Sequence, residues 1–146
     1  MAAPYNRAVF RIKSVLSGKL MNVNGDSQEN SAKIIQYTDT PGAPNELWWL
    51  DQQPNNSYKI RSVSSGKLLN VSGQSQADGA QIIQYQDSGG QPNELWTFED
   101  QGGDRYMIRS VLSKKLLNVA GASTADGASI IQYHDTNDDN SKWQFV

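Results

Sequence analysis

The 146-residue chain contains no cysteine and a single histidine, His134. Without thiols, neither a disulfide framework nor a thiolate metal site can form. With one histidine and no cysteine, the chain cannot supply the ligands of a His/Cys metal centre. His134 is also the only histidine that a catalytic triad could use. These absences argue against metalloenzymes and against the common nucleophilic hydrolases. We therefore expect a protein that is not an enzyme and that has no catalytic residue, no metal and no cofactor.

Clustered charge and long apolar runs are also lacking. The chain has 13 basic and 15 acidic residues, a formal charge of −2, and no run of like charge. Nucleic-acid binding requires a basic surface, which this composition does not provide. The apolar runs are too short to cross a bilayer, and Met1–Tyr5 lacks the features of a secretory signal. We expect a soluble protein without nucleic-acid partners or membrane insertion, either cytoplasmic or excised as a module from a secreted protein.

What the chain does contain is a threefold internal repeat. The segment Ile-Ile-Gln-Tyr ends at Tyr37, Tyr85 and Tyr133, so successive copies lie 48 residues apart. Each copy precedes a second motif, which reads Pro-Asn-Glu-Leu-Trp in the first two repeats and Asn-Ser-Lys-Trp in the third. A fixed period of this size indicates one supersecondary unit present in three copies. We expect a single domain over residues 1–146, with repeats at approximately 8–55, 56–103 and 104–146.

Each repeat contains four short segments with the pattern of a β-strand. The first places Phe10, Ile12 and Ser14 on one face and Arg11 and Lys13 on the other. Such alternation is typical of a half-buried strand. The other three are Leu-x-Asn-Val, Ile-Ile-Gln-Tyr and the segment around the motif tryptophan, and residues typical of turns separate them. No window shows apolar residues at helical spacing, so we expect little helix.

About twelve short strands predict an all-β fold. Three equivalent units cannot bury their apolar faces separately, and a closed sheet has no exposed edges. The pattern therefore favours a closed pseudo-threefold barrel with a hairpin cap over an open sandwich or a three-bladed propeller.

One turn differs between the repeats, because Lys114 stands where the other repeats have Gly18 and Gly66. We interpret this exchange as a turn that does not strictly require positive φ.

The order of these motifs resembles that of the ricin-B-type β-trefoil lectins and carbohydrate-binding modules, over Val9–Val146. Members of that family typically carry Leu-Asp-Val, then a Gln-x-Trp strand, then Asn-Gln-x-Trp. The resemblance implies a β-trefoil that binds glycans without catalysis, at up to three equivalent shallow sites acting multivalently. Galactose or N-acetylgalactosamine ends are the ligands implied most often, although other members bind xylan, arabinan or mannose. The motif tryptophans Trp48, Trp96 and Trp143 are implied to be core residues.

The resemblance also implies carbohydrate-binding side chains in every repeat. One asparagine aligns with the acceptor Asp of the family, the tyrosine stacks on the sugar, and a second asparagine followed by Glu aligns with Asn-Gln. We add the aspartate two residues after each tyrosine as a further acceptor on the same rim. The predicted set is Asn22, Tyr37, Asp39, Asn45, Glu46, Asn70, Tyr85, Asp87, Asn93, Glu94, Asn118, Tyr133, Asp135 and Asn140.

Two departures from the family bear on these sites. Asn replaces Asp in all three repeats, so the group that accepts hydrogen bonds from the sugar is left open. The third repeat loses one residue before Asn140 and carries Ser141 and Lys142 in place of Glu and Leu. We therefore favour the sites of the first and second repeats.

Other interpretations of the same residues stay open. The tyrosines could pack inside the barrel, the first asparagine of each repeat could cap a turn, and the glutamates could be surface charges. We interpret Asp78 and Asp126, each followed by Gly, as turn formers. Two other functions also stay open: a protein-binding trefoil of the protease-inhibitor or interaction type, and a symmetric folding scaffold with no retained ligand.

Overall fold

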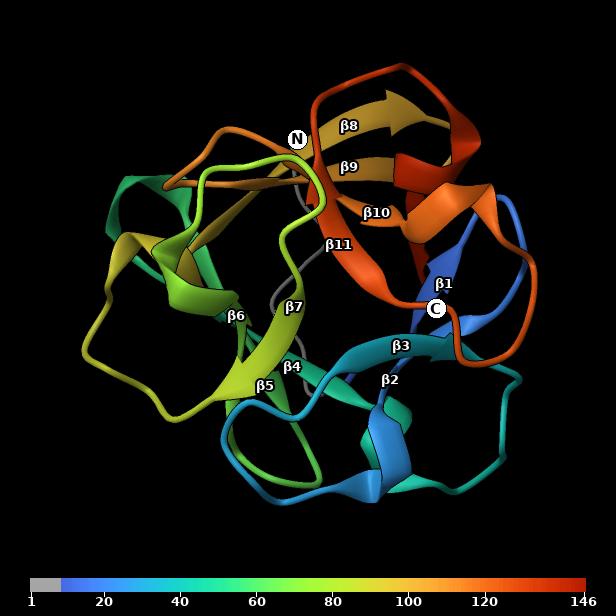
Figure 1. Cartoon of the computed structure of the whole chain (residues 1–146), viewed down its shortest axis with the longest axis horizontal. Coiled ribbons are helices and arrows are strands. Elements are labelled where there is room, and N and C mark those ends of the chain that lie inside the picture. Colours follow the sequence, from blue (N-terminus) through green and yellow to red (C-terminus); the bar gives the residue numbers. More distant parts are fainter. Residues whose placement is uncertain (1–8) are drawn as a thin grey trace.

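The computed structural model describes residues 9–146 (Figure 1). The segment Met1–Tyr5, for which the sequence showed no secretory signal, lies outside the described residues. The strands are β1 (Ile12–Ser14), β2 (Leu20–Val23), β3 (Ile34–Tyr37), β4 (Trp48–Gln52), β5 (Tyr58–Ser62), β6 (Leu68–Val71), β7 (Ile82–Tyr85), β8 (Trp96–Gly102), β9 (Arg105–Ser110), β10 (Leu116–Val119), β11 (Ile130–Tyr133) and β12 (Trp143–Phe145). Short 3-10 turns connect them: η1 (Asn24–Asp26), η2 (Pro44–Glu46), η3 (Pro54–Asn56), η4 (Ser72–Gln74), η5 (Pro92–Glu94), η6 (Ala120–Ala122) and η7 (Asp139–Ser141). Over residues 9–146 the prediction of about twelve strands is confirmed, and no α-helix forms.

Half of the strands form a closed barrel. β1 pairs with β12, β12 with β9, β9 with β8, β8 with β5, and β5 with β4. A bridge between Phe10 and Trp48 closes the ring from the chain before β1 to β4. Closure leaves the barrel without a free edge. This is the reason for which the sequence favours a closed barrel.

The other strands form three hairpins, β2–β3, β6–β7 and β10–β11, that cap the barrel. In Figure 1, β3, β7 and β11 surround the centre of the view. Bridges from Lys33 to Ile83, from Gln81 to Ile131 and from Ile35 to Ser129 join the hairpins in a ring. A barrel capped by three hairpins is a β-trefoil, so the predicted fold is confirmed.

The three motif tryptophans occupy the core, as expected. Trp48, Trp96 and Trp143 are fully buried. The indole Nε1 of each donates to a carbonyl of the second strand of its own repeat, at 3.1 Å in all three cases. Each tryptophan therefore fills the barrel and also fixes it to the hairpin above, with its one polar atom satisfied.

The glutamine of each Ile-Ile-Gln-Tyr segment joins neighbouring repeats. Gln84 is fully buried, and its Nε2 donates to the carbonyl oxygens of Ser27 and Glu29 at 2.9 and 2.8 Å. Its Oε1 accepts from Ser65 Oγ at 2.8 Å. Gln36 makes the same bonds to residues 123 and 125 and to Ser17, and Gln132 to residues 75 and 77 and to Ser113. Each repeat thus holds a loop of another repeat.

Asp78 and Asp126 also act between repeats. Asp126 Oδ1 accepts from the backbone N–H of Thr38 at 2.8 Å, and Asp78 Oδ1 accepts from that of His134 at 3.0 Å. Asn30 makes the equivalent contact to the N–H of Gln86 at 3.0 Å. The interpretation of the two aspartates as local turn formers is therefore incomplete, because each satisfies a donor just after the tyrosine strand of another repeat.

The prediction for the turn at Lys114 is wrong. Its φ is +67°, close to the +75° of Gly18 and Gly66 at the equivalent positions. All three turns therefore require a left-handed residue, and the third repeat places a lysine there.

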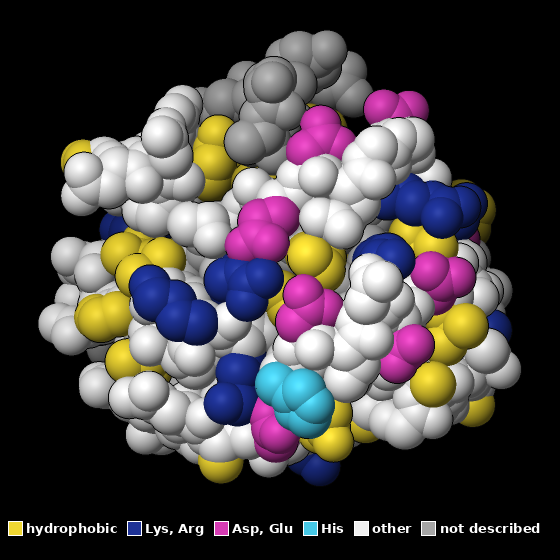
Figure 2. Space-filling model, turned by 90° about the horizontal axis from the view of Figure 1, so that it is seen from above, with side chains coloured by type: hydrophobic (Ala, Val, Ile, Leu, Met, Phe, Trp, Pro, Cys, Tyr) yellow, Lys and Arg dark blue, Asp and Glu magenta, His cyan; other side chains and the backbone are white. Residues whose placement is uncertain are grey.

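The surface agrees with the mixed composition. Figure 2 shows one face, on which acidic and basic side chains lie interspersed. Over the described part of the chain, no helix is long and apolar enough to cross a membrane. The same residues contain no group of three or more His, Cys, Asp or Glu placed to hold a metal ion.

Candidate functional site

The second and third repeats bring their predicted tyrosine and asparagines together around a hollow. In the second repeat, Asn70, Tyr85 and Asn93 line a hollow of about 300 Å³. The equivalent hollow of the third repeat, about 280 Å³, is lined by Asn118, Tyr133 and Asn140. The sequence favours the sites of the other two repeats, because the third carries Ser141 and Lys142. The third repeat nevertheless has the same arrangement of tyrosine and asparagines.

Strand register explains this arrangement. Leu68 pairs with Tyr85, and Asn70 pairs with Ile83. Alternate residues share one face of a strand, so Asn70, Ile83 and Tyr85 project to the same side. Tyr85 is 37% exposed whereas Asn70 is 5% exposed, which puts the ring on the rim and the amide at the floor. Ile83 also lines the hollow, although it was not among the predicted site residues.

The two asparagines of each repeat form a hydrogen-bonded pair. Asn93 Nδ2 donates to Asn70 Oδ1 and to the carbonyl of Val71, both at 3.2 Å. The Asn45–Asn22 and Asn140–Asn118 pairs repeat this bond at 3.2 and 3.3 Å. The interpretation of the first asparagine as a turn cap is therefore wrong, since its side-chain oxygen is bound to the second asparagine.

This pairing leaves a donor and an acceptor at the floor of the hollow. Asn70 Nδ2 makes no hydrogen bond within the described part of the chain. The Oδ1 atoms of Asn93 and Asn140 are buried and unpaired. A buried acceptor without a partner is unfavourable by about 1–3 kcal/mol. Solvent does not reach these two Oδ1 atoms, so a ligand hydroxyl gains a bond there only if the asparagine side chains shift to open them.

The predicted glutamates lie behind the hollow. Glu94 is fully buried; its Oε1 accepts from Ser88 Oγ at 2.7 Å and its Oε2 from the N–H of Gly90 at 2.8 Å. Glu46 is 1% exposed and accepts from the N–H of Thr40 at 2.8 Å. The interpretation of these glutamates as surface charges is wrong, because both hold the loop that follows the tyrosine strand.

Glu46 differs from Glu94 in its surroundings. Its Oε2 lies 3.5 Å from Arg11 Nε, and neither atom has hydrogen-bonding geometry with any described group. Burial, with a further contribution from neighbouring Asp39, raises the pKa of Glu46 above its ordinary value.

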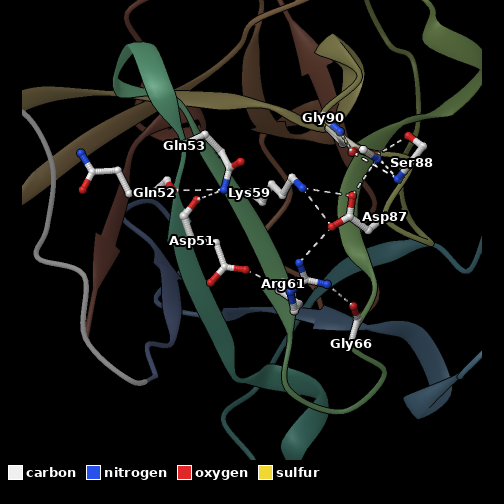
Figure 3. Close-up of polar contacts among 11 residues, drawn as sticks. Asp51, Gln52, Gln53, Lys59, Arg61, Gly66, Asp87, Ser88 and Gly90 are labelled. Atoms are coloured by element: carbon white, nitrogen blue, oxygen red, sulfur yellow. Dashed lines mark hydrogen bonds and ion pairs between the residues drawn. The ribbon is translucent and has the colours of Figure 1, made fainter.

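The aspartates after the tyrosines face the barrel strands. Asp87 is bound to Lys59 Nζ at 2.9 Å and to Arg61 Nη2 at 3.1 Å (Figure 3). Asp39 lies 4.0 Å from Arg11 Nε, and Asp135 lies 4.0 Å from Arg109 Nη2. In the second repeat, Ser88 and Gln91 line this side of the hollow. These aspartates therefore brace the loop rather than line the two hollows.

The ion pairs of Asp87 predict a dependence of stability on pH. The N–H of Gly89, then Lys59 and Arg61, lower the pKa of Asp87 below its ordinary value. A lowered folded-state pKa stabilises the protein above the unfolded pKa of about 4, and this contribution is lost as the pH falls further. Asp87→Asn should therefore be less stable than wild type at pH ~7, and its free energy of unfolding should fall less between pH ~4 and ~2.

Urea unfolding at a series of pH values measures this effect. Asp104→Asn, which alters an exposed aspartate outside the described ion pairs, is the matched control. Parallel curves for wild type and Asp87→Asn would show that the ion pairs do not contribute.

The hollows also contain residues that the motifs did not reveal. The position two residues before the motif asparagine is Gln91 in the second repeat and Asp138 in the third, and both line their hollows. The first repeat has Ala43 there. Because these positions differ between repeats, repetition could not reveal them. In the first repeat, Tyr37 is 42% exposed.

Barrel, cap and threefold repetition thus define a β-trefoil whose surface carries one Tyr–Asn–Asn arrangement per repeat. A family described as ricin-type beta-trefoil lectin domain-like matches residues 3–85 and 92–146. The chain belongs to this family, which confirms the resemblance seen in its motifs. Comparison with curated proteins gave no match.

Solved structures show the same fold. The designed threefold-symmetric protein ThreeFoil is 38% identical with a TM-score of 0.91, covering 94% of this chain and 97% of that one. An exo-β-1,3-galactanase from Clostridium thermocellum is 35% identical with a TM-score of 0.91; the match covers 99% of this chain but only 31% of the enzyme. A ricin B-like lectin from Macrolepiota procera, solved in complex with lactose, is 20% identical with a TM-score of 0.81, covering 99% and 98%.

Proposed function

We propose that this protein binds glycans without catalysis through its Tyr–Asn–Asn clusters. The clusters are Asn22, Tyr37 and Asn45; Asn70, Tyr85 and Asn93; and Asn118, Tyr133 and Asn140. The observation that carries the proposal is the asparagine pair at the floor of a hollow beneath an exposed tyrosine. A sugar offers a C–H face to an aromatic ring and hydroxyls to planar amides, which matches this arrangement.

In this proposal the amides supply both kinds of hydrogen bond. In the second repeat, Asn70 Nδ2 donates to a sugar oxygen and Asn93 Oδ1 accepts from a hydroxyl. The asparagine that replaces the family Asp thus acts as a donor, and the acceptor role passes to the second asparagine. The three aspartates and two glutamates of the predicted set act indirectly, because they hold the loop that forms one wall.

Galactose-type ends are the ligands that we propose, as lactose-like units, galactose or N-acetylgalactosamine. Support comes from the family and from the 35% identity with the module of a galactan-degrading enzyme. The lactose complex of the Macrolepiota procera lectin adds a β-trefoil with a galactose-containing ligand.

Three weak sites on one rigid body suit clustered glycans. A shallow hollow with a few neutral hydrogen bonds should bind with about −4 to −6 kcal/mol, in the millimolar to high micromolar range. Three sites engaged together can raise the apparent affinity about 10²–10⁴-fold when the geometry allows it. We therefore propose multivalent binding to branched or surface-bound glycans.

Binding without hydrolysis fits the side chains of the hollows. Glycoside hydrolysis requires two carboxyl groups about 5–10 Å apart across the scissile bond. Among the described residues, the hollow of the second repeat contains no carboxylate, and that of the third contains Asp138 alone.

A glycan array with the intact protein tests the proposal, together with Tyr85→Ala. The variant should weaken binding several-fold and shift the melting temperature by less than about 3 °C, because a rim residue contributes little to the core. Tyr58→Ala is the control, since Tyr58 is 7% exposed and belongs to the core, and it should lower the melting temperature strongly. A large destabilisation by Tyr85→Ala would show that the ring is structural.

One observation favours a second candidate function. The protein is 38% identical to a designed symmetric protein, which fits a symmetric folding scaffold with no retained ligand. No detectable binding to galactose-terminated, xylan, arabinan or mannose glycans on the array would support this candidate over glycan binding.

A further inference from the structure

A second hollow lies beside the glycan-binding hollow of the second repeat. It measures about 470 Å³, and we call it the outer groove. Gly89 and Gly90 line the outer groove, whereas Ser88 and Gln91 of the same loop line the hollow of Tyr85. The loop from Asp87 to Gln91 is therefore a wall shared by the two hollows. The opposite sides of the groove come from the turn between β4 and β5, from the start of β8 and from the turn between β9 and β10.

The shared wall is low. Gly89 and Gly90 carry no side chains, and a Cβ added to either would meet nothing within 4 Å. The loop is also fixed, because buried Glu94 binds Ser88 and Gly90. Only the second repeat has two adjacent glycines at this place. An oligosaccharide whose end occupies the Tyr85 hollow can therefore continue over the loop into the outer groove.

The outer groove is lined by a lysine side chain at a position where the other repeats have glycine. Lys114 lines it at φ +67°, where the other repeats have glycine. The left-handed conformation is unfavourable for a side chain such as lysine, and residues held in it often serve a function. Lys114 forms no ion pair with any acidic side chain of the described residues. Its charge is thus available to a ligand.

The remaining side chains of the groove complement an oxyanion attached to a sugar. Asn55 can donate through its amide, and Thr97 can donate through its hydroxyl. Gln53 Nε2 already donates to the carbonyls of Asp51 and Gln52, so Gln53 can only accept, through its Oε1. Leu95 and Val111 add apolar surface, on which the C–H face of a sugar ring can lie.

We propose that the outer groove binds an acidic sugar residue, bearing a carboxylate or a sulfate, of the same oligosaccharide whose neutral end occupies the Tyr85 hollow. Lys114 pairs with the oxyanion, Asn55 donates to a neighbouring oxygen, and Gln53 Oε1 accepts from a neighbouring hydroxyl. The inference rests on the proposed glycan binding and specifies its ligand class as acidic oligosaccharides. It applies only to the groove beside the loop of the second repeat. The first and third repeats lack the double glycine, and the positions equivalent to Lys114 of the third repeat are Gly18 and Gly66.

The test uses the full chain with Tyr37→Ala and Tyr133→Ala, which leaves only the second repeat to bind. This protein is titrated calorimetrically with lactose, sulfated lactose, sialylated lactose and inorganic sulfate at low salt. At least one acidic lactose should bind about fivefold to tenfold more tightly than lactose, since charge-assisted bonds are about twice as strong as neutral ones. Added salt should reduce this preference, and inorganic sulfate alone should bind more weakly than either sugar.

Lys114→Gly tests the residue itself. Glycine restores the residue of the other repeats at a left-handed position, so the variant should fold at least as well as the parent. It should lose the preference for acidic lactose and keep its affinity for lactose. Lys33→Gln is the control for net charge, because Lys33 is exposed and lies outside the groove; it should keep the preference, whereas Lys114→Gln should lose it.

The outcomes separate this inference from the proposed function. Equal affinities for acidic and neutral lactose, or an acidic preference that survives Lys114→Gly, would overturn the inference and leave glycan binding standing. Sulfate binding as tightly as sulfated lactose would also overturn it, by showing an isolated anion site. Failure of every sugar to bind would overturn the proposed function itself.

Discussion

Replacing Gln84 with alanine should lower the free energy of unfolding by about 2–5 kcal/mol, since each carbonyl left buried without a donor costs about 1–3 kcal/mol. The Gln84 amide donates to two carbonyls of the first repeat and accepts from Ser65. Alanine removes these bonds and leaves a gap where a fully buried side chain stood. The effect should be large because the bonds join two repeats and the side chain that is removed is fully buried.

Thermal and urea unfolding measure this change, with an expected fall of about 10 °C in melting temperature. Gln76→Ala is the matched control, because Gln76 is exposed, and it should shift stability by less than about 0.5 kcal/mol. Gln84→Ala unfolding like the control would mean that the joint between repeats is not held by the glutamines.

Replacing Tyr37, Tyr85 and Tyr133 together with alanine should reduce binding to a glycan-coated surface by about 100-fold or more, because multivalent gain disappears with the individual sites. Each single replacement removes one of three contacts and should weaken surface binding less. Tyr37 and Tyr85 are 42% and 37% exposed, so their loss should cost little stability. Surface plasmon resonance on a galactose-bearing surface, with free lactose as competitor, measures the effect. Retained binding by a folded triple variant would place the glycan elsewhere on the protein.

The fold could be predicted because each strand and turn pattern occurs three times at nearly the same spacing. Period-two strands and a 48-residue repeat were enough to favour a capped threefold barrel, and the core positions of Trp48, Trp96 and Trp143 followed from the family resemblance. The asparagines and tyrosines of the candidate site were identified through repetition and resemblance together. Their mutual placement in the second and third repeats agrees with the strand register.

The remaining features depend on contacts that no local pattern encodes. Gln84 binds carbonyls 55 and 57 residues away. Glu94 resembled a rim residue because its motif position aligned with a sugar-binding glutamine, yet it is fully buried and binds Ser88 and Gly90 of the loop that precedes it. The left-handed turn at Lys114 was hidden because a lysine rarely adopts that conformation. Gln91 and Asp138 differ between repeats, so comparison within the chain could not identify them.

The most direct test of glycan binding at the asparagine pairs is an NMR titration that follows the side-chain amide signals of Asn22, Asn70 and Asn118. Lactose is added first, and xylan-, arabinan- and mannose-type oligosaccharides follow in separate titrations. The account predicts that lactose shifts these amide signals, since their Nδ2 groups face the bound sugar, while the indole signals of the buried tryptophans stay in place. Amide signals that remain unmoved by every sugar would contradict the account.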